Sequence, residues 1–179
     1  MISIRISGKG GQGVKTIGEL LAEASVLEGL NAIQTAVYTP EVKGGSSSAD
    51  IIISEKEIYY PLIRKIDILL AFTQNAVKYN LKKITPKSTI IYDSSHFALE
   101  KIPNVNIIEV PFENISLKEF GKDVFFNIMA LGFLISYIKI ISPERVLDLI
   151  SKKLKGSDEI NTRLFFKGLE LGKKYEKKV

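Results

Sequence analysis

Hydrophobic and polar residues change from one periodicity to another along the first third of the chain. Residues 2–7 alternate between apolar and polar, which is typical of a strand, and residues 14–28 place apolar side chains at helical spacing. A second strand is predicted at 31–38 and a third at 49–54, where consecutive isoleucines indicate burial on both faces. The chain therefore begins with a strand, a glycine-rich loop, a helix and a second strand.

The middle of the chain continues this alternation. Apolar runs predict strands at 66–72, 88–93 and 104–110, and a polar helix is predicted at 74–83, before a turn at Pro86. Strands that alternate with helices are typical of parallel sheets, because each parallel connection needs a crossover. The pattern predicts an α/β fold with a three-layer, mostly parallel, Rossmann-like sheet and helices on both faces.

The C-terminal part is predicted to be rich in helices, at about 123–140, at 143–154 and from 157 onward. The stretch 124–138 has no charged residue, but it is shorter than the roughly 20 residues that span a bilayer. We expect a buried helix there. We also expect a cytoplasmic protein without a membrane anchor, because no secretory signal is visible. At 179 residues the chain is expected to form a single domain, 1–179.

Composition narrows the chemistry of the chain. It contains no cysteine and one histidine, His96. These counts exclude disulfides, thiolate zinc sites, iron–sulfur clusters held by cysteines of this chain, and multi-histidine metal sites. The net charge of +5 indicates a lysine-rich surface. No basic stretch is interleaved with aromatic residues as in a stacking surface, so a nucleic acid is not an expected ligand. A metal is not expected either, because of the cysteine and histidine counts.

A glycine-rich loop joins the first predicted strand to the first helix. It consists of Gly8, Lys9, Gly10, Gly11, Gln12 and Gly13. Glycine adopts positive φ without strain and lets a ligand approach the backbone closely. The start of the following helix presents free N–H groups and the positive end of its dipole, which suit an anion such as phosphate. Two interpretations stay open: a loop that binds an anion or nucleotide, and a tight turn that only packs helix against strand.

Two familiar motifs can be tested on this loop. Residues 8–13 match the dinucleotide fingerprint Gly-x-Gly-x-x-Gly, after a strand and before a helix. That fingerprint also needs an acid at the end of the second strand to hold a ribose, and no Asp or Glu lies within 31–38. A P-loop needs lysine at position 14, where this chain has Val14, and Lys15 comes one residue late.

A second candidate loop follows the second strand and contains Lys43, Gly44 and Gly45, before serines at 46–48. Because it follows a strand, as the glycine loop does, we expect it at the same edge of the sheet, where open α/β sheets bind ligands. A lysine before two glycines and three hydroxyls suits an anion. On chemistry alone, the favoured alternative is an ordinary surface loop.

Asp93, Ser94, Ser95 and His96 follow a strand and invite a hydrolase interpretation. However, no Gly-x-Ser-x-Gly elbow surrounds either serine. Adjacent residues on a turn also point apart, so their proximity in sequence does not make a catalytic triad. We interpret these residues as a polar loop at the end of a strand, and we predict no catalytic residue in this chain.

With its two candidate loops taken together, the chain resembles the gamma subunits of 2-oxoacid:ferredoxin oxidoreductases. These enzymes include pyruvate, 2-oxoglutarate and branched-chain 2-oxoacid types. The motifs are Gly-x-Gly-Gly-Gln-Gly at 8–13 and Tyr-x-x-Glu-x-Lys-Gly-Gly at 38–45. Further landmarks occur in the expected order: Asp93-Ser94-Ser95, Val110-Pro111, residues 127–132 and Glu159-x-Asn161. The family commonly has Arg in place of Lys43, so the positive charge is kept but the bidentate fork is lost.

The resemblance implies a gamma component that binds no thiamine, in a complex that oxidatively decarboxylates a 2-oxoacid to acyl-CoA and reduces ferredoxin. It implies that thiamine diphosphate and iron–sulfur clusters are held largely by the alpha, beta and delta subunits. The isolated chain would be inactive and able to form a homodimer. The residues expected to border coenzyme A are Gly8, Gly10, Gly11, Gln12, Gly13, Lys43, Gly44 and Gly45. The alternative is a stand-alone Rossmann-type protein that binds NAD or a flavin.

Overall fold

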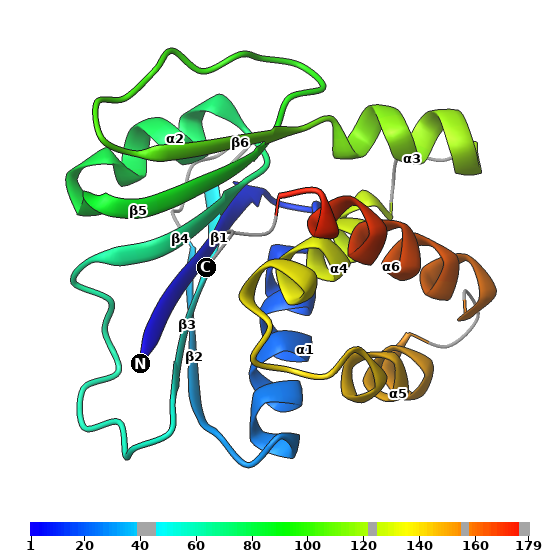
Figure 1. Cartoon of the computed structure of the whole chain (residues 1–179), viewed down its shortest axis with the longest axis horizontal. Coiled ribbons are helices and arrows are strands. Elements are labelled where there is room, and N and C mark those ends of the chain that lie inside the picture. Colours follow the sequence, from blue (N-terminus) through cyan, green and yellow to red (C-terminus); the bar gives the residue numbers. More distant parts are fainter. Residues whose placement is uncertain (39–45, 122–124, 155–157, 176–179) are drawn as a thin grey trace.

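The protein, here a computed structural model, is built around one six-stranded sheet (Figure 1). The structure describes residues 1–38, 46–121, 125–154 and 158–175. In the order in which they lie in the sheet, the strands are β2 (Asn31–Tyr38), β3 (Ser46–Ser54), β1 (Ile2–Lys9), β4 (Ile66–Ala71), β5 (Ile84–Asp93) and β6 (Asn106–Val110).

Five strands run in one direction and β3 runs in the other. β1, β4, β5 and β6 pair in parallel, whereas β3 pairs antiparallel with both β1 and β2. A parallel crossover needs a dozen or more residues, and only residues 39–45 connect β2 to β3, so β3 returns antiparallel. The predicted α/β, mostly parallel sheet is confirmed, while β3 departs from the expected alternation of strands and helices.

Helices lie on both faces of the sheet, as predicted, but unequally. They are α1 (Val14–Leu27), α2 (Gln74–Asn80), the 3₁₀ helix η1 (Leu81–Lys83), α3 (Phe112–Phe120), α4 (Phe126–Ile138), α5 (Pro143–Lys153) and α6 (Asp158–Lys173). On one face, α1 and α4 to α6 pack over the larger core, which includes Leu21 and Phe133 (Figure 1). On the other face, α2 and the connections at 55–65 and 94–105 cover a smaller core.

The helix-rich C-terminal part is centred on α4, and the prediction of a buried helix is confirmed, because every residue from Phe126 to Ile135 is buried. α6 packs on it so closely that both helices carry glycine at the contact. A Cβ at Gly168 would lie 1.9 Å from the carbonyl oxygen of Met129, and one at Gly132 would lie 2.2 Å from that of Phe165. Across the described ranges, every helix is too short or too polar to span a bilayer.

The structure departs from the predicted pattern in two places. Residues 112–120 form α3, which the sequence pattern did not predict, and its start is capped by a segment far away in the sequence. Pro86, predicted as a turn, lies within β5. The pairing of β4 with β5 shifts there, from Ile66–Ile84 to Ile68–Thr89, so the proline falls in a bulge between paired positions.

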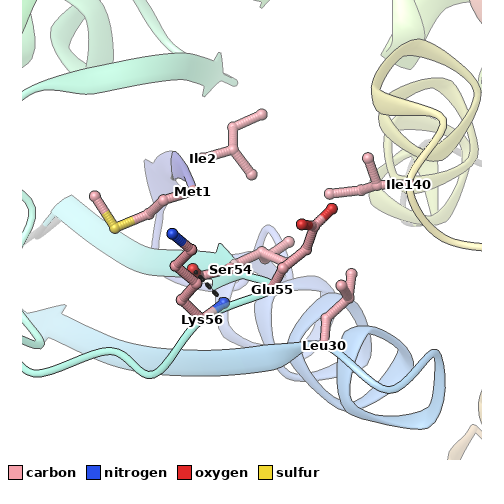
Figure 2. A pocket seen from close by; sticks show the side chains of 8 residues that line it. Met1, Ile2, Leu30, Ser54, Glu55, Lys56 and Ile140 are labelled. Atoms are coloured by element: carbon pink, nitrogen blue, oxygen red, sulfur yellow. Dashed lines mark hydrogen bonds between the residues drawn. The ribbon is translucent and has the colours of Figure 1, made fainter.

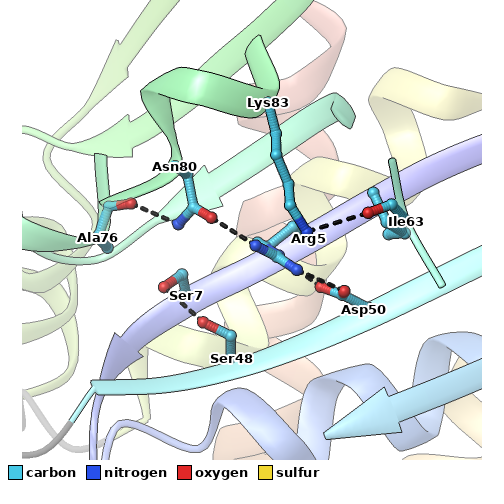
Figure 3. A network of polar contacts seen from close by, with 8 residues as sticks. All are labelled: Arg5, Ser7, Ser48, Asp50, Ile63, Ala76, Asn80 and Lys83. Carbon is cyan, nitrogen blue, oxygen red and sulfur yellow. Dashed lines mark hydrogen bonds and ion pairs between the residues drawn. The ribbon is translucent and has the colours of Figure 1, made fainter. Parts of the chain in front are cut away.

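A buried ion pair joins β1 to β3 on the α2 face. Arg5 donates from Nε and Nη2 to the two carboxylate oxygens of Asp50, each at 2.5 Å, and from Nη1 to Asn80 Oδ1 at 2.6 Å (Figure 3). The hydroxyls of Ser7 and Ser48 meet at 2.8 Å one row further along. Because a slip of one residue would send these side chains to opposite faces, the pairs specify the register of β1 against β3.

Candidate functional site

Gly8 and Lys9 of the glycine loop are the last residues of β1, and the loop is closed by one of its own side chains. The N–H of Lys9 donates to Gln12 Oε1 at 2.7 Å, and the N–H of Gln12 donates to the Lys9 carbonyl oxygen at 3.3 Å. Gly11 has φ of 87° and Gly13 has φ of 69°, a region that other residues rarely adopt. Gln12 therefore shapes the loop, and these two glycines allow its turn.

One side of the loop is open to a ligand. No described atom lies within 4 Å of where a Cβ would be on Gly10 or Gly11. Gly13 caps α1 with its backbone alone, no described side chain accepts the first N–H groups, and the first turn carries no acid. The N–H groups and the positive end of the α1 dipole are therefore available for an anion.

Asn127 lies against the other side of the loop. It is 7% exposed, and its Nδ2 lies 2.1 Å from where a Cβ on Gly13 would be. Its Oδ1 is buried and has no hydrogen-bond partner among the described residues. Next to it, the ring of Phe126 meets that of Phe72 edge-on at 5.0 Å, which docks the start of α4 on the sheet. In the sequence, Asn127 stands out only as an amide within the apolar stretch 124–138. Asn127 was not assigned to the site from the sequence.

The strand ends around the second candidate loop lie at the same edge of the sheet, as expected. Tyr38 pairs with Ser47, which pairs with Gly8, and Ser46 pairs with Lys9. The chain therefore leaves β2 and enters β3 beside the glycine loop. Lys43, Gly44 and Gly45 themselves lie outside the described residues, so their role as ligands stays a prediction.

The polar segment after β5 caps a helix and does not form a catalytic triad. Asp93 Oδ1 accepts from the N–H of Ser95 at 3.0 Å and from its hydroxyl at 2.6 Å. Ser95 Oγ in turn accepts from the N–H of Asn114, in the first turn of α3, at 3.0 Å. His96 Nε2 lies 2.8 Å from Glu113 Oε1, not on a serine. This bonding agrees with the interpretation as a polar loop. Within the described ranges, no group of three or more acids and histidines could hold a metal ion.

Two groups in this segment have raised pKa values. Burial raises the pKa of Asp93, against the opposing hydrogen bonds from Ser95. The hydrogen bond to Glu113, reinforced by its charge, raises the pKa of the exposed His96. Ionisation of the buried Asp93 carboxyl therefore opposes folding.

We expect the Asp93→Asn variant to gain stability over the wild type as pH rises. An acid whose pKa is raised in the folded state holds its proton more tightly there than in the unfolded chain, so folding stability falls as pH rises from the usual value, 3.8, through the raised one. Asn keeps an oxygen that can accept from Ser95 but cannot ionise. Urea unfolding between about pH 4 and 7 checks this, with the exposed Asp148→Asn as the control. Parallel curves for wild type and Asp93→Asn would contradict it.

Comparison with known proteins identifies a family that the chain matches over most of its length. The family model described as pyruvate ferredoxin/flavodoxin oxidoreductase matches residues 3–171. The 2-oxoglutarate synthase subunit KorC of Archaeoglobus fulgidus is 38% identical over 176 residues, which cover 98% of this chain and 90% of the relative.

Two solved structures share the fold closely. The gamma subunit of a keto/oxoacid ferredoxin oxidoreductase from Geobacter sulfurreducens superposes with a TM-score of 0.83 at 28% identity, over 96% of this chain and 98% of that one. The 2-oxoglutarate:ferredoxin oxidoreductase of Magnetococcus marinus, solved with 2-oxoglutarate, coenzyme A and succinyl-CoA bound, gives a TM-score of 0.86 at 28% identity. That match covers 97% of this chain and 31% of the larger one.

Proposed function

This chain belongs to the pyruvate ferredoxin/flavodoxin oxidoreductase family, and we propose that it is the gamma component of a 2-oxoglutarate:ferredoxin oxidoreductase. It is homologous to the gamma subunits of 2-oxoacid:ferredoxin oxidoreductases, and the expectation drawn from its motifs is confirmed at that level. The finer choice of 2-oxoglutarate is supported by the 38% identity to a 2-oxoglutarate synthase subunit, which extends over nearly the whole chain.

In this proposal, the complex converts the 2-oxoacid and coenzyme A to acyl-CoA and carbon dioxide, and ferredoxin takes the electrons. Thiamine diphosphate and iron–sulfur clusters supply the decarboxylation and the electron transfer, and the alpha, beta and delta subunits hold them. A chain without cysteine has no thiolate with which to ligate a cluster. The contribution of this chain is then to bind and orient, rather than to act as acid, base or nucleophile.

We assign the glycine loop to an anionic part of coenzyme A, and the observation that carries this is the open, uncapped start of α1 beside Gly10 and Gly11. Backbone N–H groups at a helix start suit phosphate oxygens, and the adjoining Asn127 has a buried oxygen to which no described residue donates. Gln12 holds the shape of the loop through Lys9. Lys43 would add a positive point charge, with Gly44 and Gly45 allowing close approach.

The stand-alone Rossmann alternative is disfavoured by the order of the strands. In the dinucleotide-binding fold, the second strand lies beside the first, so that its terminal acid reaches the ribose next to the glycine loop. Here β3 lies between β1 and β2, and residues 31–38 carry no acid. An NAD ribose at this loop would therefore lack its usual partner.

A negative charge at Gly10 is expected to weaken coenzyme A binding by the assembled complex by about tenfold or more, roughly 1.4 kcal/mol. Gly10 has an ordinary φ and open space, so Gly10→Glu should fold and place a carboxylate where we expect phosphate. Gly10→Gln has the same size without the charge and is the matched control. Isothermal titration with coenzyme A measures both. Equal affinities for the Glu and Gln variants would remove the loop from the coenzyme A site.

A further inference from the structure

Basic side chains outnumber acidic ones in residues 56–87, all of which the structure describes. This stretch contains seven basic residues and two acidic ones, which gives it a net charge of +5. The basic residues are Lys56, Arg64, Lys65, Lys78, Lys82, Lys83 and Lys87. The two acids are engaged within the chain: Glu57 accepts from the Tyr59 hydroxyl at 2.7 Å and Asp67 from the N–H of Ser3 at 2.8 Å.

These residues come together at the amino-terminal edge of the parallel strands. The Nζ of Lys83 donates to the carbonyl oxygen of Ile63 at 3.0 Å (Figure 3), and Ile66 at the start of β4 pairs with Ile84 at the start of β5. The connection before β4 and the turn after α2 therefore adjoin each other (Figure 1). We call the surface formed by residues 56–65 and 78–87 the basic edge.

The basic edge also exposes large apolar side chains. Tyr59 is 89% exposed, Leu62 55% and Tyr79 63%. Tyr59 and Leu62 line a concavity of about 760 Å³, together with Met1. Met1 also lines a second concavity of about 670 Å³, between Leu30 and Ile140 (Figure 2). Tyrosine, methionine and arginine are enriched at protein–protein interfaces, and Met1, Tyr59 and Arg64 all line the first of these concavities.

We propose that the basic edge docks on an acidic surface of another subunit of the same oxidoreductase complex, an inference that rests on the proposed function. Charge complementarity selects the partner, since an unbalanced group of lysines attracts carboxylates and repels another basic face. The basic edge lies at the end of the sheet opposite the glycine loop, so docking there leaves the open side of Gly10 and Gly11 free.

Three observations favour a protein partner over a nucleic acid. The guanidinium of Arg64 covers the ring of Tyr60, 4.8 Å from its centroid, so one face of that ring is not available for stacking a base. The concavity is lined by aliphatic side chains such as Met1 and Leu62, which suit an apolar side chain at the centre of an interface. The fold is also 31% of a longer chain in the Magnetococcus marinus enzyme, where it is one part of a larger polypeptide.

The test compares two double charge reversals in the full chain, purified beside the remaining subunits of its own complex. The Lys65→Glu/Lys82→Glu variant changes the basic edge, and the Lys118→Glu/Lys152→Glu variant makes the same charge change on exposed residues of α3 and α5. Biolayer interferometry gives the dissociation constant at about 0.05 M and about 0.5 M salt, where screening differs strongly. Circular dichroism verifies that both variants are folded.

We expect the basic-edge variant to bind at least about tenfold more weakly at low salt, with a smaller difference at high salt, while the control stays within about twofold of wild type. Equal affinities for wild type and the basic-edge variant would overturn the inference and leave the proposed function standing. A wild-type chain that binds none of the subunits would overturn both. Binding of the wild-type chain to a single-stranded oligonucleotide instead, lost in Lys65→Glu/Lys82→Glu, would also overturn the protein partner.

Discussion

Replacing Arg5 by Met is expected to lower the free energy of unfolding by about 3–5 kcal/mol, because it leaves the carboxylate of Asp50 buried without its partner. The two side chains form a bidentate pair at 2.5 Å between β1 and β3, and Asn80 completes the bonding of the guanidinium at 2.6 Å. Met keeps most of the apolar volume of the arginine stem, so the loss measures the charge rather than a cavity.

A double variant distinguishes the contribution of the ion pair from the cost of leaving one charge buried alone. Arg5→Met/Asp50→Leu removes both charges, and we expect it to recover a large part of the loss, because apolar groups can replace a buried ion pair at little cost. Asn80 Oδ1 then lacks a donor, which limits the recovery by about 1–3 kcal/mol. Urea unfolding followed by circular dichroism measures all three chains.

An exposed ion pair provides the matched control for this comparison. Lys152 and Asp148 form an exposed pair on α5, and Lys152→Met is expected to cost no more than about 1 kcal/mol. If Arg5→Met costs no more than Lys152→Met, the guanidinium does not compensate a buried charge, and the register of β1 against β3 is specified by the apolar positions alone.

Local features of the site were predictable from the sequence, because they depend on neighbours in the chain. The glycine loop between β1 and α1 follows from four glycines between an alternating segment and a helical one. The edge of the sheet at which β2 ends and β3 begins was also predictable, because a strand that runs parallel to β1 ends at the same edge. Neither prediction required knowing which strands pair.

Features that depend on distant residues were not predictable. The place of β3 between β1 and β2 results from pairing that the pattern of isoleucines does not specify, because a strand buried on both faces fits any interior position. α3 is capped by Ser95, on a loop nineteen residues earlier, so its start lacks a local signal. Asn127 reaches Gly13 only because α4 packs against the end of the sheet.

Replacing Gly168 by Ala is expected to destabilise the protein by about 3 kcal/mol or more, although alanine is the better helix former by about 1 kcal/mol. The added Cβ would lie 1.9 Å from the carbonyl oxygen of Met129 and 2.8 Å from the N of Phe133, both backbone atoms of α4. Backbone cannot rotate away as a side chain can, so α4 and α6 must move apart and lose packed contacts.

Alanine substitutions at two other glycines, Gly172 and Gly10, serve as comparisons for the stability loss of Gly168→Ala. At Gly172 a Cβ would lie 2.7 Å from the nearest atom, so Gly172→Ala should cost less than Gly168→Ala. At Gly10 no described atom lies within 4 Å, so Gly10→Ala should leave stability within about 0.5 kcal/mol of wild type. Urea unfolding of the three variants gives the order, and a Gly168→Ala variant as stable as wild type would mean that α4 and α6 lie further apart than described.

Gly168→Ala is also expected to affect the glycine loop, through the position of α4. Asn127 lies on α4 less than one turn before Met129, and its amide rests on Gly13. A shift of α4 away from α6 presses Asn127 against the glycine loop or withdraws it, because the interior is too densely packed to absorb the movement elsewhere. We therefore expect Gly168→Ala, where it still assembles, to bind coenzyme A more weakly than Gly172→Ala in isothermal titration. Unchanged affinity together with lost stability would mean that the position of α4 does not shape the loop.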